Sequence, residues 1–283
     1  MPRRLFVLLP PSESKEDGGS RSHQPGIFDS ALDVPRRDVV AALATLLGNG
    51  DSHKIETTFR VHGALLERAI EASHAIVEGR ARFLPAWQRY NGVVWNHLDP
   101  HSLNFQQRRR IIVPCGLLGV TTAQDPICDY RLKMNASLSP LGGLATFWRP
   151  RITPVLLDHC DGATVVNLLP KEHAAALESG TLGARCRVIT VSFISDAAAA
   201  IAGHEAKAVK GVLARHLLVE GLGSLDSFAW RGWRVRRGEH DASHATARAR
   251  AREIVIEFVG DAHGPSLEVS DTPFGRERES APN

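Results

Sequence analysis

The opening Leu5-Phe6-Val7-Leu8-Leu9-Pro10-Pro11-Ser12-Glu13-Ser14-Lys15 decides how the rest of the chain is interpreted. Its five apolar residues predict a buried strand. Because proline lacks the amide donor that a paired strand needs, that strand must end at Pro10. The polar residues that follow therefore lie at the end of a sheet, where side chains from several loops converge on a ligand.

Further apolar and β-branched runs predict strands along the chain, and they alternate irregularly with segments of helical periodicity. No linker separates two cores, so we expect one compact α/β domain with a mixed central sheet flanked by helices. It should span 1–263, followed by a loose polar tail at 264–283. The other expected strands are 110–116, 132–138, 164–169, 187–193 and 253–258; the expected helices are 36–48, 60–84, 147–157, 171–177 and 196–220; a long loop is expected at 16–35; and 90–95 fits either a hairpin or a strand–turn–helix.

The bulk composition is typical of a globular protein. The 283 residues are 43% hydrophobic and 23% charged, with a formal net charge of +3. No run reaches the ~20 apolar residues of a membrane helix, and the apolar stretch before Pro10 is too short for a secretory signal. We therefore expect a cytoplasmic protein without membrane contact. Its four cysteines form no CxxC pair and are expected to be ordinary reduced thiols.

Seven short segments of the chain also match the motifs of a known family. They are Leu8–Lys15, Tyr90–Val93, Cys115–Val120, Tyr130–Met134, Phe147–Pro150, Val165–Leu168 and Lys207–Gly211 with Arg215 beyond. In this order they resemble the YaaA family, which is linked to peroxide stress, over roughly residues 5–233. The resemblance implies a cantaloupe fold in an intracellular protein that protects against oxidative stress. It also implies nucleic-acid binding by a basic cleft, and it brings no settled reaction.

The sequence departs from the family beside these motifs. Cys115-Gly116 stands where small Ser/Ala-type residues are common, Thr121–Gln124 replaces a stretch that often carries Arg-Pro, and Asn135 follows where glycine is usual. Changes next to retained motifs suggest an altered pocket. The chain therefore fits a specialised member, such as an enzyme of a biosynthetic pathway.

The residues after the first strand offer chemistry of their own. Lys15 can bind phosphate or carboxylate, and burial could lower its pKa enough for base or Schiff-base reactions. Ser12 and Ser14 could add hydroxyl donors to the same anion, although serines in loops often bond their own backbone. A solvated Lys15 is the plain alternative, and the family motif favours a role facing a ligand.

Tyr130 and Arg131 form the next candidate pair. Arginine presents a planar fork suited to carboxylate or phosphate, and tyrosine can stack on a base or donate a proton. Neighbours in a strand point to opposite faces, so we expect only one of them, Arg131, to face the site. A structural pair between Arg131 and a carboxylate remains the alternative.

A basic stripe is expected on the helix at 196–220. His204, Lys207 and Lys210 recur every three residues and so share one face, with Arg215 further round. The stripe suits a nucleic-acid backbone or the phosphate of a small molecule, and it is also typical of a solvated helix face.

Three functions remain open from the sequence. The first is a stress protein that binds DNA through its basic side chains. The second is an enzyme acting on an anionic or heterocyclic small molecule, with Lys15, Arg131 and Lys207 as the catalytic candidates. The third is a protein-interaction scaffold. No metal site, GxGxxG, Walker lysine loop or GxSxG elbow is present, so no metal or other cofactor is expected.

Overall fold

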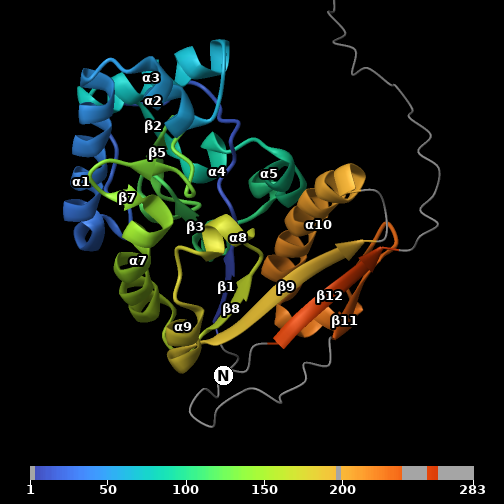
Figure 1. The fold of residues 1–283 in the computed structure, drawn as a ribbon. Coiled ribbons are helices and arrows are strands. Elements are labelled where there is room, and N and C mark those ends of the chain that lie inside the picture. The colour runs from blue at the N-terminus through green and yellow to red at the C-terminus, as the bar shows by residue number, and fades with distance from the viewer. Residues whose placement is uncertain (1–3, 196–198, 238–253, 261–283) are drawn as a thin grey trace, which may run out of the picture.

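The computed structural model of the protein describes residues 4–195, 199–237 and 254–260, which form a mixed α/β fold with helices around a central sheet (Figure 1). The expected fold class is confirmed. The strands are β1 (Leu5–Leu8), β2 (Phe83–Pro85), β3 (Ile111–Cys115), β4 (Gly119–Thr122), β5 (Pro126–Cys128), β6 (Ser137–Leu138), β7 (Gly142–Gly143), β8 (Thr164–Asn167), β9 (Arg187–Ser195), β10 (Ala229–Trp230), β11 (Trp233–Arg237) and β12 (Ile254–Gly260).

Helices occupy most of the chain between these strands. They are α1 (Asp29–Gly48), α2 (Ser52–Phe59), α3 (Ala64–Val77), α4 (Ala86–Arg89), α5 (Val93–Leu98), α6 (Phe105–Arg109), α7 (Leu144–Cys160), α8 (Lys171–Ala174), α9 (Ser179–Arg185) and α10 (Ala199–Glu220), with short 3₁₀ turns η1 (Pro100–Ser102) and η2 (Leu222–Ser227). The tail expected at 264–283, the first three residues of the helix expected at 196–220 and residue 253 of the last expected strand lie outside the described residues.

The main sheet has the strand order β10-β11-β12-β9-β8-β1-β3-β4 within the described ranges. β1 pairs in parallel with β3 on one side and with β8 on the other, and Leu8 lies opposite both Ile112 and Asn167. The chain leaves β1 toward β3 and later returns to the opposite side of β1 at β8. The carboxyl ends of β1 and β8 therefore mark a topological switch point, the place where open α/β sheets bind ligands.

The first strand is buried from both faces, as its unbroken apolar run predicts. Val7 and Leu8, whose side chains point to opposite faces of the sheet, are both buried, with 0% and 1% of their surfaces exposed. α10 contacts β1 and β9 and packs along α5, while α1 packs with α2, α3 and α7 in another part of the molecule (Figure 1). None of the helices in the described ranges has the length and apolar character needed to cross a bilayer.

The expected loop at 16–35 is wrong in its second half, because α1 begins at Asp29 and contains Pro35. Tertiary contacts offset the amide hydrogen bond that proline removes from the helix. Arg36 pairs with Asp29 and donates from Nη2 to the carbonyl of Val120 at 2.9 Å. Leu32 is buried, which also fixes the first turn in the core.

Three other expectations change locally. Residues 90–95 adopt the strand–turn–helix alternative: Tyr90 forms an isolated bridge with Lys15 and α5 follows at once. The extended segment expected at 132–138 is irregular except for the short β6. The helical region expected at 60–84 contains one helix, α3, and ends at the start of β2. The hairpin strand β4 at one edge of the sheet, and β10 and β11 at its other end, were not expected, since their runs are short.

Candidate functional site

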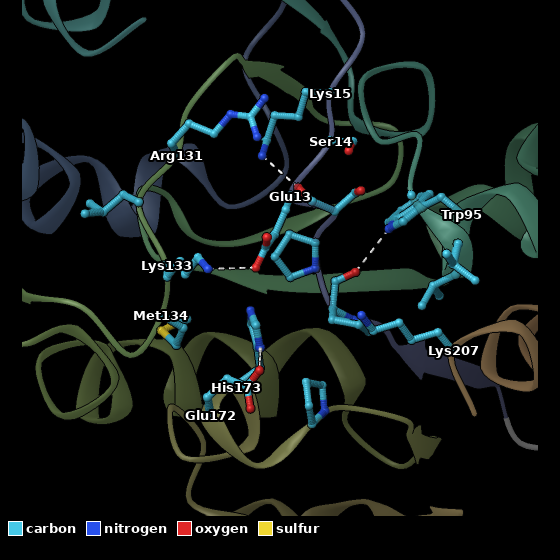
Figure 2. Close-up of a pocket in the computed structure, with 18 of the residues that line it drawn as sticks. Glu13, Ser14, Lys15, Trp95, Arg131, Lys133, Met134, Glu172, His173 and Lys207 are labelled. Atoms are coloured by element: carbon cyan, nitrogen blue, oxygen red, sulfur yellow. Dashed lines mark hydrogen bonds and ion pairs between the residues drawn. The ribbon is translucent and has the colours of Figure 1, made fainter. Parts of the chain in front are cut away.

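A pocket of about 480 Å³ lies where the chain leaves the carboxyl ends of β1 and β8 (Figure 2). This volume suits a small molecule. Four of the chain's six lysines line the pocket. The charged lining side chains are Lys15, Arg131, Lys133, Lys207, Lys210, Glu13 and Glu172, so the cations outnumber the carboxylates.

Lys15 is buried at one end of this pocket, with 5% of its surface exposed. Its Nζ donates a 2.7 Å hydrogen bond to the backbone oxygen of Ser12. The same atom lies 4.2 Å from the centre of the Tyr130 ring and 5.6 Å from that of Tyr90. No carboxylate in the described part of the chain forms an ion pair with it. The ammonium group is therefore held by a carbonyl dipole and two aromatic faces.

The surroundings of Lys15 favour its neutral amine. Burial, and after it the nearby charge of Arg131, lowers the pKa of Lys15 from its usual 10.5 to about 8, while Asp129 opposes the shift. Desolvation penalises the ammonium form, and the second cation adds to that penalty. The amine is thus a base and a nucleophile within reach of neutral pH, as the sequence suggested for a buried lysine.

The segment that carries Lys15 is fixed from behind by two arginines. Arg68 on α3 donates from Nη2 to the carbonyl of Lys15 at 3.1 Å and from Nε to Asp129 at 2.9 Å. Arg89 at the end of α4 donates to the carbonyl of Gly18 at 3.0 Å and is itself buried. These contacts order the backbone after β1 without placing a counter-ion on the Lys15 ammonium.

Tyr130 and Arg131 both line the pocket, so the expectation that only one of them would face it is wrong. Its premise fails because residues 129–133 are not a strand and their side chains need not alternate. Tyr130 is buried with its hydroxyl 2.7 Å from that of Tyr90. Arg131 is half-buried beside Lys15 (Figure 2) and forms no ion pair with a carboxylate in the part of the chain that the structure describes.

The two serines play different parts in the pocket wall. Ser12 is buried and contributes its backbone oxygen to Lys15, whereas Ser14 is exposed. Gly92 fits against Ser12 so closely that a Cβ there would lie 2.3 Å from the Ser12 hydroxyl oxygen. The motif after β1 and the Asn91-Gly92 motif are thus packed against one another in this wall.

Only some residues of the basic stripe expected on α10 line the pocket. Lys207 is exposed and Lys210 half-buried, and both line the pocket. His204 is exposed and does not line it, and Arg215 bonds the hydroxyl of Ser102 at 3.0 Å. The close approach expected at Gly211 is made by α5 of the same chain, since a Cβ there would lie 2.2 Å from the carbonyl oxygen of Val94.

Sequence reasoning missed several residues of the pocket. Lys133 pairs with Glu13 at 2.9 Å across it (Figure 2), and this contact lowers the pKa of Glu13. His173 follows β8, and burial lowers its pKa to about 4, so its imidazole is neutral at pH 7. The Pro170-Lys171-Glu172-His173 stretch repeats the pattern of a strand followed by proline and charged residues. That pattern could have drawn attention to it.

The residues at which the sequence departs from the family motifs differ in their position relative to the pocket. Asn135 lines the pocket, whereas Thr121–Gln124 does not. Cys115 is buried next to the hydroxyl of Tyr130. Within the described ranges, no group of three or more His, Cys, Asp or Glu side chains is arranged to hold a metal ion.

The four thiols should be unreactive in the folded protein. All are buried and free of disulfides. Burial raises the pKa of each, to about 12 for Cys128 and Cys160, and the thiolate is the form that reacts. We expect native protein at pH 7.5 to give less than about one equivalent of rapid reaction with a disulfide reagent, and unfolded protein to give all four. Fast modification of Cys115 in the native state would contradict this.

Comparisons with known proteins agree on one family. A family model described as "Peroxide stress protein YaaA" matches residues 5–238. A UPF0246 protein of Corynebacterium glutamicum is 28% identical over 263 residues, which cover 89% of this chain and 95% of the relative. A UPF0246 protein of C. glutamicum strain R is 30% identical over 223 residues, 75% of this chain and 84% of the relative. A UPF0246 protein of Burkholderia thailandensis is 30% identical over 154 residues, 51% of this chain and 59% of the relative.

Proposed function

The chain belongs to the peroxide stress protein YaaA family, and from this premise we propose a cytoplasmic protein that binds the anionic group of a small molecule in the Lys15 pocket. One observation carries the proposal: Lys15 and Arg131 lie together in the pocket, and no carboxylate in the described ranges pairs with either. Two neighbouring cations without a counter-ion are costly to bury. A ligand carboxylate or phosphate would offset that cost.

The depth of Lys15 favours a small molecule over a polymer. A side chain that is 5% exposed cannot reach the phosphates of a duplex lying across the surface. A single anionic group entering a pocket of about 480 Å³ can approach both Arg131 and the end of Lys15. Arg131 offers its fork to two oxygens at once, and its Nε is buried without a hydrogen-bond partner in the described part of the chain.

Replacing Arg131 by glutamine is expected to weaken binding of inorganic pyrophosphate roughly 10- to 100-fold, because a charge-assisted hydrogen bond contributes about 1.5–3 kcal/mol. Isothermal titration calorimetry at fixed ionic strength measures the change. Arg37→Gln is the matched control. Arg37 is an exposed residue of α1 outside the pocket lining, so this substitution removes the same charge without changing the pocket. Equal losses of pyrophosphate affinity in both variants would show only a general charge effect and would contradict the proposal.

Nucleic-acid binding is a second candidate, favoured by the exposed side chains of His204 and Lys207, one turn apart on α10, of which Lys207 lines the pocket. On this view, duplex phosphates contact the rim and leave Lys15 untouched. Each cation that meets a phosphate adds about one unit to the salt slope of log affinity.

Lys207→Gln should therefore reduce that slope by about one for a duplex oligonucleotide, measured by fluorescence anisotropy between low and physiological salt. Arg131→Gln should leave the same slope unchanged. Absence of any binding at low salt would remove the nucleic-acid candidate and would leave the small-anion proposal standing.

A further inference from the structure

Lys15 differs from every other lysine of the pocket in its partners. Lys133 pairs with Glu13, Lys207 is exposed, and Lys210 lies over the Phe193 ring with Glu172 nearby. Lys15 is almost wholly buried, and its one hydrogen bond among the described residues goes to a backbone carbonyl. No carboxylate among the residues that the structure describes pairs with it and holds it as a cation. A buried amine of this kind loses its proton more easily than an exposed one, and the neutral amine is the form that reacts with carbonyl compounds.

Arg131 supplies the second requirement, which is a fixed point of attachment beside the amine. Its guanidinium lies next to Lys15 in the pocket (Figure 2) and has no carboxylate partner in the described ranges. A carboxylate bound there would carry its neighbouring carbon toward the Lys15 nitrogen. The aromatic faces of Tyr130 and Tyr90 close the other side of that nitrogen, so a reactant must approach from the pocket.

We propose that Lys15 forms an imine with the carbonyl carbon of a small oxo acid whose carboxylate is held by Arg131. The inference rests on the anion-binding function proposed above and names its ligand class. The neutral amine adds its lone pair to the carbonyl carbon and gives a carbinolamine. In that intermediate one nitrogen proton has moved to the former carbonyl oxygen. Loss of the resulting hydroxyl together with the remaining nitrogen proton releases one water molecule and leaves a C=N bond. No oxidant, metal or other co-reactant is consumed.

The acidity of Lys15 supports the step. With a pKa of about 8, roughly a quarter of Lys15 is neutral at pH 7.5, against about one part in a thousand for an ordinary lysine. The selectivity comes from the pocket, since an exposed lysine such as Lys54 pairs with Asp51 at the surface and lies outside the pocket that holds Arg131.

Reductive trapping tests this directly. Full-length protein is incubated at pH 8 with glyoxylate and cyanoborohydride, and the modified lysine is located by peptide mass spectrometry. Acetaldehyde is the matched probe, because it carries the same aldehyde without the carboxylate. We expect saturable modification of Lys15 by glyoxylate, at least tenfold faster than at Lys54. Arg131→Gln should reduce that rate about tenfold, with little change for acetaldehyde.

Two further measurements keep the outcomes separate. Lys15→Arg retains the charge and should still bind pyrophosphate within a few-fold of the parent while forming no adduct in the pocket. If pyrophosphate binds and glyoxylate modifies lysines only in order of exposure, or modifies Lys210 or Lys207 in preference, the imine proposal is overturned and the anion site stands. If pyrophosphate does not bind the parent protein at all, the anion site itself fails. The selectivity within the parent protein decides the matter even if the arginine variant does not fold.

Discussion

Gly211→Ala is expected to destabilise the protein by about 3 kcal/mol, the upper range for forcing an extra carbon into a packed interface. The added Cβ would lie 2.2 Å from the carbonyl oxygen of Val94 and 2.8 Å from the Leu98 nitrogen. Those atoms belong to the backbone of α5, which cannot move aside as a flexible side chain can. α10 would have to withdraw from α5, and Lys207 and Lys210 would move with it.

The same helix offers a control with the opposite sign. Gly203 also lies in α10, but nothing lies within 4 Å of a Cβ built there. Gly203→Ala should stabilise the protein by about 0.5–1 kcal/mol, through helix propensity and a less flexible unfolded chain. Urea unfolding of both variants measures the two changes. A destabilisation of Gly211→Ala no larger than a few tenths of a kcal/mol would show that the two helices are not packed this closely.

Lys15 is expected to make stability rise with pH above about 8. Its pKa is about 8 when folded and near the usual 10.5 when unfolded. Between these values the unfolded chain holds a proton that the folded protein has lost, so raising the pH favours the folded state. The cost of the buried charge is fully present below pH 8 and is relieved toward pH 10.5. From pH 7 to 10 the gain should be about 2–3 kcal/mol.

Lys15→Met isolates the contribution of Lys15 to this pH dependence. The cysteines and tyrosines also titrate at high pH, but they are present in both proteins, so their effect cancels in the comparison. Urea unfolding of the parent and the variant at several pH values gives two curves, and the parent should gain stability relative to Lys15→Met as pH rises. Curves that stay parallel would mean that Lys15 keeps an ordinary proton affinity in the fold, and the basis for its nucleophilic role would be lost.

The sequence predicted the central part of the fold well because those strands are buried on both faces. β1, β3 and β8 are buried along their whole length, and these strands and β9 are short runs rich in Val, Ile and other apolar residues, which is the composition of strands in a covered sheet. The start of α1 was missed since Pro35 argues locally against a helix, and its anchors, Val120 and Leu118, are distant in sequence. Local patterns cannot reveal such contacts.

The candidate site was predicted in part for the same reason. Seven of the nine expected residues line one pocket, because they follow strand ends or lie on the helix that faces them. His204 and Arg215 do not, since a stripe judged from helical spacing ignores where the neighbouring α5 and η1 lie. Lys133 and His173 were missed, because their place depends on the irregular path of residues 129–136 and on the order of strands in the sheet.

The two tyrosines give the pocket a built-in reporter. Tyr90 and Tyr130 are the only tyrosines of the chain, and their hydroxyls are hydrogen-bonded to each other beneath Lys15. Protein grown on fluorotyrosine would therefore carry its only two fluorine nuclei in the wall of this pocket. A fluorine NMR spectrum would contain just two resonances, both sensitive to the charge on Lys15. Ligands could be screened, and the lysine titrated, without any label chosen by mutation.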